Sequence, residues 1–129
     1  MIYLAILLVV ALAVLCVLLA DPWESRGAAE KRADELLRAC LGEEEYGRLA
    51  TAGYLEVPSS LQPDRLYRIP KRRGPVAVYE RGTPIMALCV QPVEPLPRGD
   101  TVLLHKLLIE GDEERYLRVA RPLPYRYGP

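Results

Sequence analysis

The chain has 129 residues, with 17 basic and 17 acidic side chains and a formal net charge of 0. Beyond its apolar start it is long enough for one small domain rather than two. A balanced charge argues against nucleic acid as a partner, because it gives no general attraction to a phosphate backbone.

Residues 2–20 contain no charged side chain and no proline. A helix of this length reaches roughly 28 Å, close to the thickness of the hydrocarbon layer of a bilayer. Tyr3 and Trp23 stand near its two ends, where aromatic rings favour the membrane interface. A cleaved signal peptide is the alternative, but it needs a basic start, a shorter apolar region and small residues before the cleavage site. The sequence therefore predicts an uncleaved transmembrane anchor over residues 1–22, with the lipid bilayer as a partner.

Basic residues follow this span closely and none precedes it. The positive-inside rule then predicts a single-pass protein with its soluble domain in the cytoplasm. Unpaired cysteines fit such a reducing compartment, because their wide spacing suits neither a disulfide framework nor a metal motif. The basic residues are Arg26, Lys31, Arg32 and Arg38, and the cysteines are Cys16, Cys40 and Cys89.

Residues 23–121 are predicted to form one small α+β domain that begins with two helices within residues 25–53. Ser25 is a candidate N-cap, and apolar residues then recur at helical spacing. Gly42 interrupts the pattern. Three consecutive glutamates follow it, at a position where they complement a helix dipole. Consecutive helical residues point in different directions, so these glutamates do not predict a metal site.

Four short segments rich in β-formers come next, at residues 54–57, 65–69, 76–80 and 85–90. The links between them contain proline and glycine, which suits an antiparallel meander. The fourth segment is apolar on both faces. We therefore expect it to be central in the sheet and covered on each side.

Residues 101–110 predict a helix, with Asp100 as its N-cap. One broad face of this helix carries four leucines, and we expect that face to cover the sheet. Val102 and Ile109 form a second, narrow apolar ridge on the far side. A ridge of this kind is predicted to contact the outer helices or another subunit. The leucines are Leu103, Leu104, Leu107 and Leu108.

The far ridge and the end of the chain supply the candidate partner surface. Tyr and Arg are favoured at protein interfaces, and the last residues contain both. The predicted surface consists of Val102, His105, Lys106, Ile109, Tyr125, Arg126 and Tyr127. Residues 115–121 are predicted to form a last strand with Leu117 and Val119 pointing inward, and residues 122–129 to form an irregular tail.

No recognisable catalytic constellation is present in the sequence. His105 is the only histidine, and a nucleophilic pair with Cys89 is the one conceivable arrangement. A thiol on a central strand is more typical of a core position. We therefore predict no catalytic, cofactor-binding or metal-binding residue and no enzymatic activity.

Six basic residues gather on the second and third predicted strands and the turns beside them. Such a cluster could contact anionic lipid headgroups, an acidic partner or nucleic acid, or it could simply protect a strand edge from aggregation. The candidate anionic-ligand patch is Arg65, Arg68, Lys71, Arg72, Arg73 and Arg81.

The stretches "GYLEVPSS", "RLYRIP", "VAVYE" and "LLHKLLIEGDEERYLRVA" resemble a small domain of unknown function met in uncharacterised bacterial proteins. The resemblance covers roughly residues 34–121. It implies a bacterial origin, and hence the inner membrane, and it adds no catalytic residue.

Two functions are compatible with these features. The first is a non-catalytic, single-pass accessory subunit of a bacterial multi-subunit membrane complex, respiratory or photosynthetic, that binds other membrane-protein subunits. The second is a free membrane-tethered binding module whose arginine-rich hairpin holds anionic lipid or nucleic acid. Binding by the second should weaken steeply with salt, whereas an apolar docked subunit should resist it.

Overall fold

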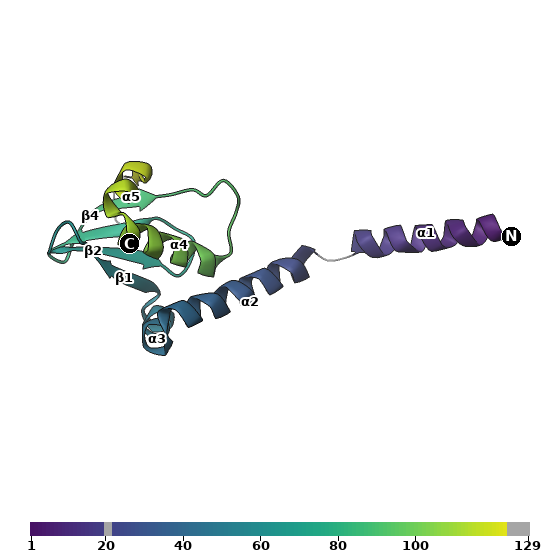
Figure 1. Cartoon of the computed structure of the whole chain (residues 1–129), viewed down its shortest axis with the longest axis horizontal. Helices are drawn as coiled ribbons and strands as arrows, with labels where there is room; N and C mark the ends of the chain where they lie inside the picture. Colours follow the sequence, from purple (N-terminus) through teal and green to yellow (C-terminus); the bar gives the residue numbers. More distant parts are fainter. Residues whose placement is uncertain (20–21, 124–129) are drawn as a thin grey trace.

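The computed structural model describes residues 1–19 and 22–123 and has the predicted α+β fold (Figure 1). Five helices and five strands are present within those residues. In chain order the elements are α1 (Ile2–Leu19), α2 (Pro22–Leu41), α3 (Glu43–Ala52), β1 (Tyr54–Pro58), β2 (Arg65–Pro70), β3 (Val76–Glu80), β4 (Thr83–Cys89), α4 (Arg98–Gly111), α5 (Glu113–Val119) and β5 (Arg121–Leu123).

The strands form a single antiparallel sheet in the order β1-β2-β3-β4-β5. Short connections join the first four, which confirms the predicted meander, and β5 adds to β4 only after two intervening helices. Tyr67 in β2 lies opposite Val57 in β1 and Val78 in β3. The tight turn between β3 and β4 places both Arg81 and Gly82 at positive φ, 51° and 77°. Glycine adopts such a backbone conformation without steric cost.

The hydrophobic core lies between one face of the sheet and the helices that follow α1. Figure 1 shows α4 lying across the sheet, and α4 contacts β1, β2 and α2. Alternate residues of β1, β2 and β3 point into this layer, as the period of two requires. The fully buried members with the largest side chains are Tyr67, Tyr116, Leu49, Ile69, Ile109, Val57, Val76, Val78 and Val102.

Glycine ends the helices at the predicted places. Gly42 separates α2 from α3 with φ of 85°, and Gly53 ends α3 in the left-handed conformation with φ of 82°. The two predicted N-caps are wrong, however. α2 begins at Pro22, so Ser25 lies inside the helix, and α4 begins at Arg98, so Asp100 lies in its first turn.

The prediction of a last strand over residues 115–121 is also wrong, because most of these residues form helix α5. The Asp112 side chain accepts a hydrogen bond of 3.0 Å from the backbone N–H of Arg115 and caps the helix. Two glutamates then occupy the first turn, where their negative charges interact favourably with the positive end of the helix dipole. Tyr116 is the buried residue, while Val119, expected to point inward, is 63% exposed.

β4 is covered less completely than its composition suggests. It pairs with β3 on one side and with the three-residue strand β5 on the other. Ala87 and Leu88 are buried, but Ile85 near its start is exposed. The prediction of a central strand covered on both sides is therefore wrong at the start of β4.

Candidate functional site

Helix α4 turns the opposite face toward the sheet from the one predicted. Val102 and Ile109 are each only 2% exposed and His105 is 4% exposed, so the predicted outer ridge is part of the core. Lys106 stays at the surface side and makes an ion pair of 2.6 Å with Glu110. The prediction that Val102, His105 and Ile109 contact a partner is wrong, because the domain itself covers them.

Close contact between α4 and α2 explains this orientation. A Cβ atom on Gly99 would lie 2.7 Å from the backbone oxygen of Ala33, so only glycine permits the two helices to approach this closely. Gly99, Val102, His105 and Ile109 follow each other at helical spacing along one side of α4. Once Gly99 faces α2, this line faces inward. Leu107 and Leu108 are then exposed, while Leu103 stays partly buried against the core.

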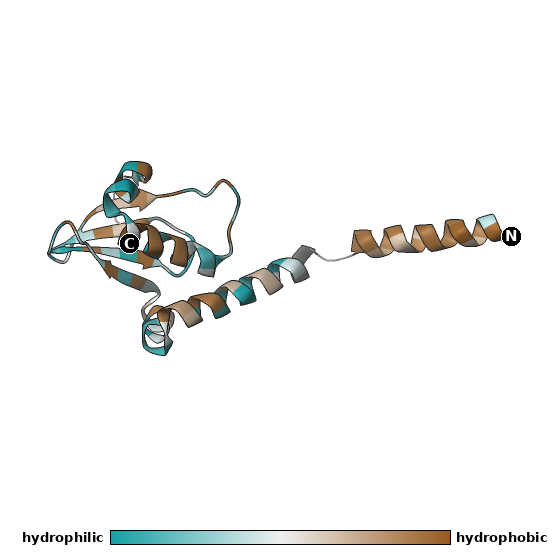
Figure 2. Ribbon diagram, viewed as in Figure 1, coloured by the Kyte–Doolittle hydropathy of each residue, from teal (hydrophilic) through white to brown (hydrophobic). Residues whose placement is uncertain are grey.

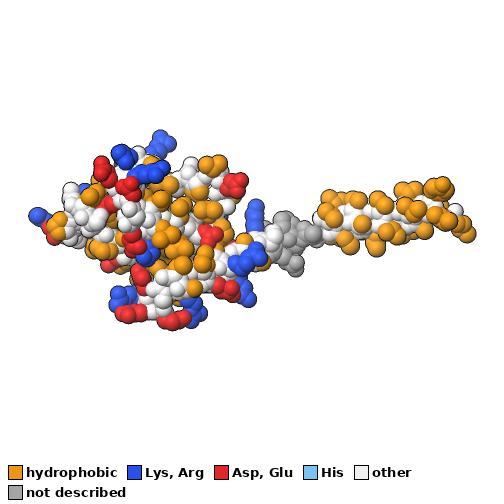
Figure 3. Space-filling model, in the orientation of Figure 1, with side chains coloured by type: hydrophobic (Ala, Val, Ile, Leu, Met, Phe, Trp, Pro, Cys, Tyr) orange, Lys and Arg blue, Asp and Glu red, His pale blue; other side chains and the backbone are white. Residues whose placement is uncertain are grey.

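Two of the four leucines form an apolar exposed surface on α4. Leu107 is 58% exposed and Leu108 38% exposed. With Leu104 on α4 and Val119 on α5, they make what we call the leucine face. α4 is brown over most of its length in Figure 2, and Figure 3 shows hydrophobic side chains gathered over it. A shallow groove of about 410 Å³ separates the ends of α4 and α5 here, lined by Leu107, Leu108 and Val119 among others.

A buried carboxylate, not predicted from the sequence, joins α5 to β2 and to the connection between β1 and β2. Glu113 accepts hydrogen bonds from the hydroxyl of Ser59, from the backbone N–H and hydroxyl of Ser60 at 2.7 and 2.8 Å, and from the Tyr67 hydroxyl at 2.6 Å. Burial raises the pKa of this carboxyl, but the hydrogen bonds outweigh burial and lower the pKa to about 2. Burial and the same carboxylate raise the pKa of Tyr67 to about 12.

His105 belongs to a neighbouring buried contact. Its Nδ1 atom and the Tyr116 hydroxyl are joined by a hydrogen bond of 3.0 Å. The Tyr116 ring packs edge-on against both His105 and Tyr67, with centroid distances of 5.9 and 6.2 Å. Burial lowers the pKa of His105, so the imidazole is neutral near pH 7. Within residues 1–19 and 22–123 no buried side-chain polar atom lacks a partner, which suits a structural role for these groups.

Cys89 and His105 line the same cavity, of about 510 Å³, beneath the proline-rich connection from β4 to α4. The structure thus places the two residues of the conceivable nucleophilic pair beside one space. A hydrogen bond between them, which would activate the thiol, is not among the hydrogen bonds of the described residues, and Nδ1 of the imidazole is used by Tyr116. The cavity does not supply an activated nucleophile.

The predicted anionic-ligand patch separates into two groups. Three of its arginines are neutralised by acids: Arg65 bonds Glu80 at 2.5 Å, and Arg81 bonds Asp64 at 3.4 Å. The third, Arg68, bonds Glu56 at 3.0 Å, and its guanidinium lies 4.6 and 4.2 Å from the ring centres of Tyr54 and Tyr79. Lys71, Arg72 and Arg73 remain together in the connection between β2 and β3.

α1 is long and apolar enough to cross a membrane, and every residue of it is exposed (Figure 2). A signal sequence near the N-terminus can meet the same criteria of length and apolar composition. Tyr3 lies at its first turn. Trp23 lies in the first turn of α2, but its side chain is outside the described part of the structure, as are Tyr125, Arg126 and Tyr127.

No protein-family model, curated protein or solved structure matches this chain. The resemblance to an uncharacterised bacterial domain therefore stays a prediction.

Proposed function

We propose that this chain is a single-pass, non-catalytic accessory subunit of a multi-subunit complex in the bacterial inner membrane. In this proposal α1 anchors the chain in the bilayer, the α+β domain lies in the cytoplasm, and the leucine face docks against another subunit. The leucine face is the observation that carries the proposal.

An exposed apolar surface of this kind is costly in a free domain. Leucine side chains gain about 1.5–3 kcal/mol on full burial, yet Leu107 and Leu108 remain in water while a histidine occupies the core. Contiguous apolar patches with a polar rim are typical of protein contacts. Lys106, Glu110 and Arg115 supply such a rim around the groove between α4 and α5.

The chemistry of the surface indicates the kind of partner. A groove lined by leucine and valine suits an apolar helix or loop of another protein, and the resulting contact gains little from charge. The chain's own apolar anchor keeps the domain close to proteins of the same membrane, which raises their effective concentration near this face. Binding should therefore persist at high salt.

Native electrophoresis with mass spectrometry tests this proposal on membranes solubilised in mild detergent. We expect the wild-type chain to co-migrate with a larger complex in fixed ratio. Leu107→Glu should reduce the co-migrating fraction by roughly tenfold or more, as loss of an interface anchor does. Leu61→Glu is the matched control, because Leu61 is also exposed but lies in the connection between β1 and β2.

Raising the salt should leave the wild-type complex intact, since the contact is apolar. Migration of the wild-type chain alone would overturn the subunit proposal and favour the free tethered module. Equal retention of the Leu107→Glu and Leu61→Glu variants would show that the leucine face is not the contact.

A further inference from the structure

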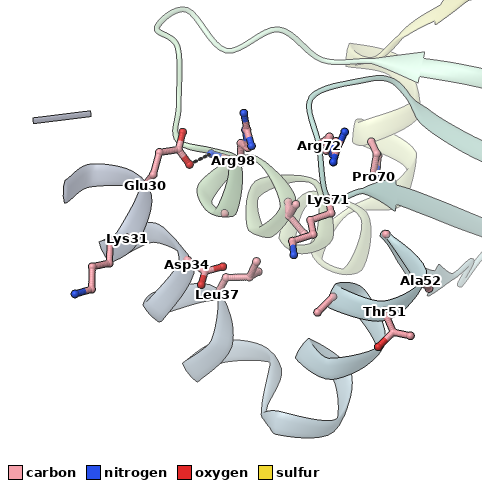
Figure 4. Close-up of a pocket in the computed structure, with 14 residues that line it drawn as sticks. Glu30, Lys31, Asp34, Leu37, Thr51, Ala52, Pro70, Lys71, Arg72 and Arg98 are labelled. Atoms are coloured by element: carbon pink, nitrogen blue, oxygen red, sulfur yellow. Dashed lines mark hydrogen bonds between the residues drawn. The ribbon is translucent and has the colours of Figure 1, made fainter. Parts of the chain in front are cut away.

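A groove runs along helix α2, between this helix and the rest of the domain. It has a volume of about 680 Å³ and is bounded by α2, the end of α3, the β2–β3 connection and the start of α4 (Figure 4). In Figure 4, Lys71 points into the groove, while Arg72 and Arg98 stand along its rim. These three cations come from sequence positions as far apart as 71 and 98, and only the tertiary structure brings them together.

The three side chains are chemically available. Lys71, Arg72 and Arg98 make no side-chain hydrogen bond or ion pair with any other described residue, in contrast to the paired Arg65 and Arg68 of the sheet. Arg73, next along the chain, reaches the backbone oxygen of Leu96 at 3.4 Å. Cations without a carboxylate partner are the ones free to bind an external anion.

The two acids of the groove are already occupied. Glu30 accepts a hydrogen bond of 3.1 Å from the backbone N–H of Arg98, and Asp34 accepts one of 2.7 Å from the Tyr46 hydroxyl. The lining contains four basic side chains, counting Lys31, which points away in Figure 4, and these two acids. Without Lys31, the three remaining cations exceed the two carboxylates by one positive charge.

The position of the groove along the chain suggests the source of the anion. α1 ends at Leu19 and α2 begins at Pro22, so at most three residue steps, about 10 Å, separate them. From Pro22 to Glu30 the helix rises about 12 Å. The headgroup layer extends about 5–8 Å beyond the hydrocarbon. With α1 in a bilayer, these lengths bring the groove to the headgroups when α2 lies nearly parallel to the membrane surface. A nucleic acid would then have to enter the narrow space between the domain and the bilayer.

From these observations we infer that Lys71, Arg72 and Arg98 bind the phosphate group of an anionic lipid headgroup and hold the domain against the membrane surface. Clusters of basic residues next to a span recognise anionic lipids in this way, and arginine forms paired hydrogen bonds with phosphate oxygens. The inference rests on the anchoring role proposed for α1, but not on docking through the leucine face.

Native mass spectrometry of the full chain in mild detergent, at about 0.15 M salt, tests the site. The probes are dioleoylphosphatidylglycerol and dioleoylphosphatidylcholine, which differ in net charge but not in acyl chains. We expect roughly tenfold preference for phosphatidylglycerol in the wild-type chain. The double variant Lys71→Gln/Arg72→Gln should lose this preference, and Lys71→Arg/Arg72→Lys should keep it.

Arg118→Gln/Arg121→Gln is the matched control, because it removes the same charge from exposed positions on α5 and β5 that line neither this groove nor the one at the leucine face. Retention of the preference in this control supports a local site. Equal loss in both double glutamine variants, or no preference in the wild-type chain, would overturn it. Competition by inorganic phosphate at the affinity of the lipid would show that a soluble anion is the ligand. Complex formation through the leucine face is unchanged in each case, so the two proposals fail separately.

Discussion

At the scale of single residues, Glu113 joins parts of the chain that are far apart in sequence. Its carboxylate receives hydrogen bonds from the β1–β2 connection and from Tyr67 in the middle of the sheet. A buried charge is costly unless such donors surround it, and here they outweigh the cost and depress its pKa to about 2. Little in the sequence indicates that Glu113 is buried. It lies in a run of three acidic residues, a pattern typical of a solvent-exposed helix start.

Glu113→Gln should therefore destabilise the domain by about 2–3 kcal/mol at pH 7. Because the folded pKa lies below the ordinary value of 4.5, the carboxylate's contribution is complete above that value and is lost as the pH falls toward 2. Urea denaturation of wild type and variant in detergent checks this: the difference in stability should be constant above about pH 5 and should narrow as the pH falls toward 2. Glu114→Gln, an exposed neighbour, serves as control. A difference that does not change with pH would contradict the assignment.

At the scale of elements, the contact between α2 and α4 decides how α4 is turned. Gly99 lies against the backbone of Ala33, and this contact places His105 beside Tyr116. The face of α4 that packs inward is narrower and less apolar than the leucine face. Packing geometry outweighs the amount of apolar surface because the helices approach only where a side chain is absent.

Gly99→Ala should cost about 1–3 kcal/mol of stability, because the new methyl group would force the two helices apart. Gly47→Ala makes the same chemical change but should raise the stability instead of lowering it. Gly47 lies inside α3 with open space around it, so alanine should stabilise the helix by about 0.5–1 kcal/mol. Thermal unfolding followed by circular dichroism distinguishes them. Stabilisation by both substitutions would show that the Gly99 contact is not tight.

At the scale of the whole molecule, an entirely apolar helix and a domain with balanced charge are joined by two residues. α1 has no buried residue, and its length and apolar composition are compatible with a membrane span. In the proposed arrangement, the groove of Lys71, Arg72 and Arg98 contacts the membrane surface and the leucine face contacts a protein neighbour.

An uncleaved anchor predicts that the chain recovered from alkaline-washed membranes retains residues 2–19. Intact-mass measurement checks this directly. A chain that begins beyond residue 20 would identify α1 as a signal sequence instead. Accessibility of Cys40, exposed on α2, to a membrane-impermeant thiol reagent in sealed inverted vesicles then tests the cytoplasmic orientation. Labelling only in right-side-out vesicles would contradict it.

Much of this protein is determined by local sequence. The apolar run of α1, the glycines at positions 42 and 53 and the alternation within β1 to β3 are each confirmed, because helix length, backbone freedom and strand period act over a few neighbouring residues. The same holds for the meander, whose short links leave little choice of pairing.

Tertiary structure decided the rest. It selected the inner face of α4 through a contact with Ala33, and it made residues 113–119 a helix that carries Glu113 and Tyr116 into the core. It also neutralised three arginines of the predicted patch and gathered Lys71, Arg72 and Arg98 into a groove. Each outcome depends on a partner distant in sequence, and a local pattern carries no information about which distant group will lie within bonding distance.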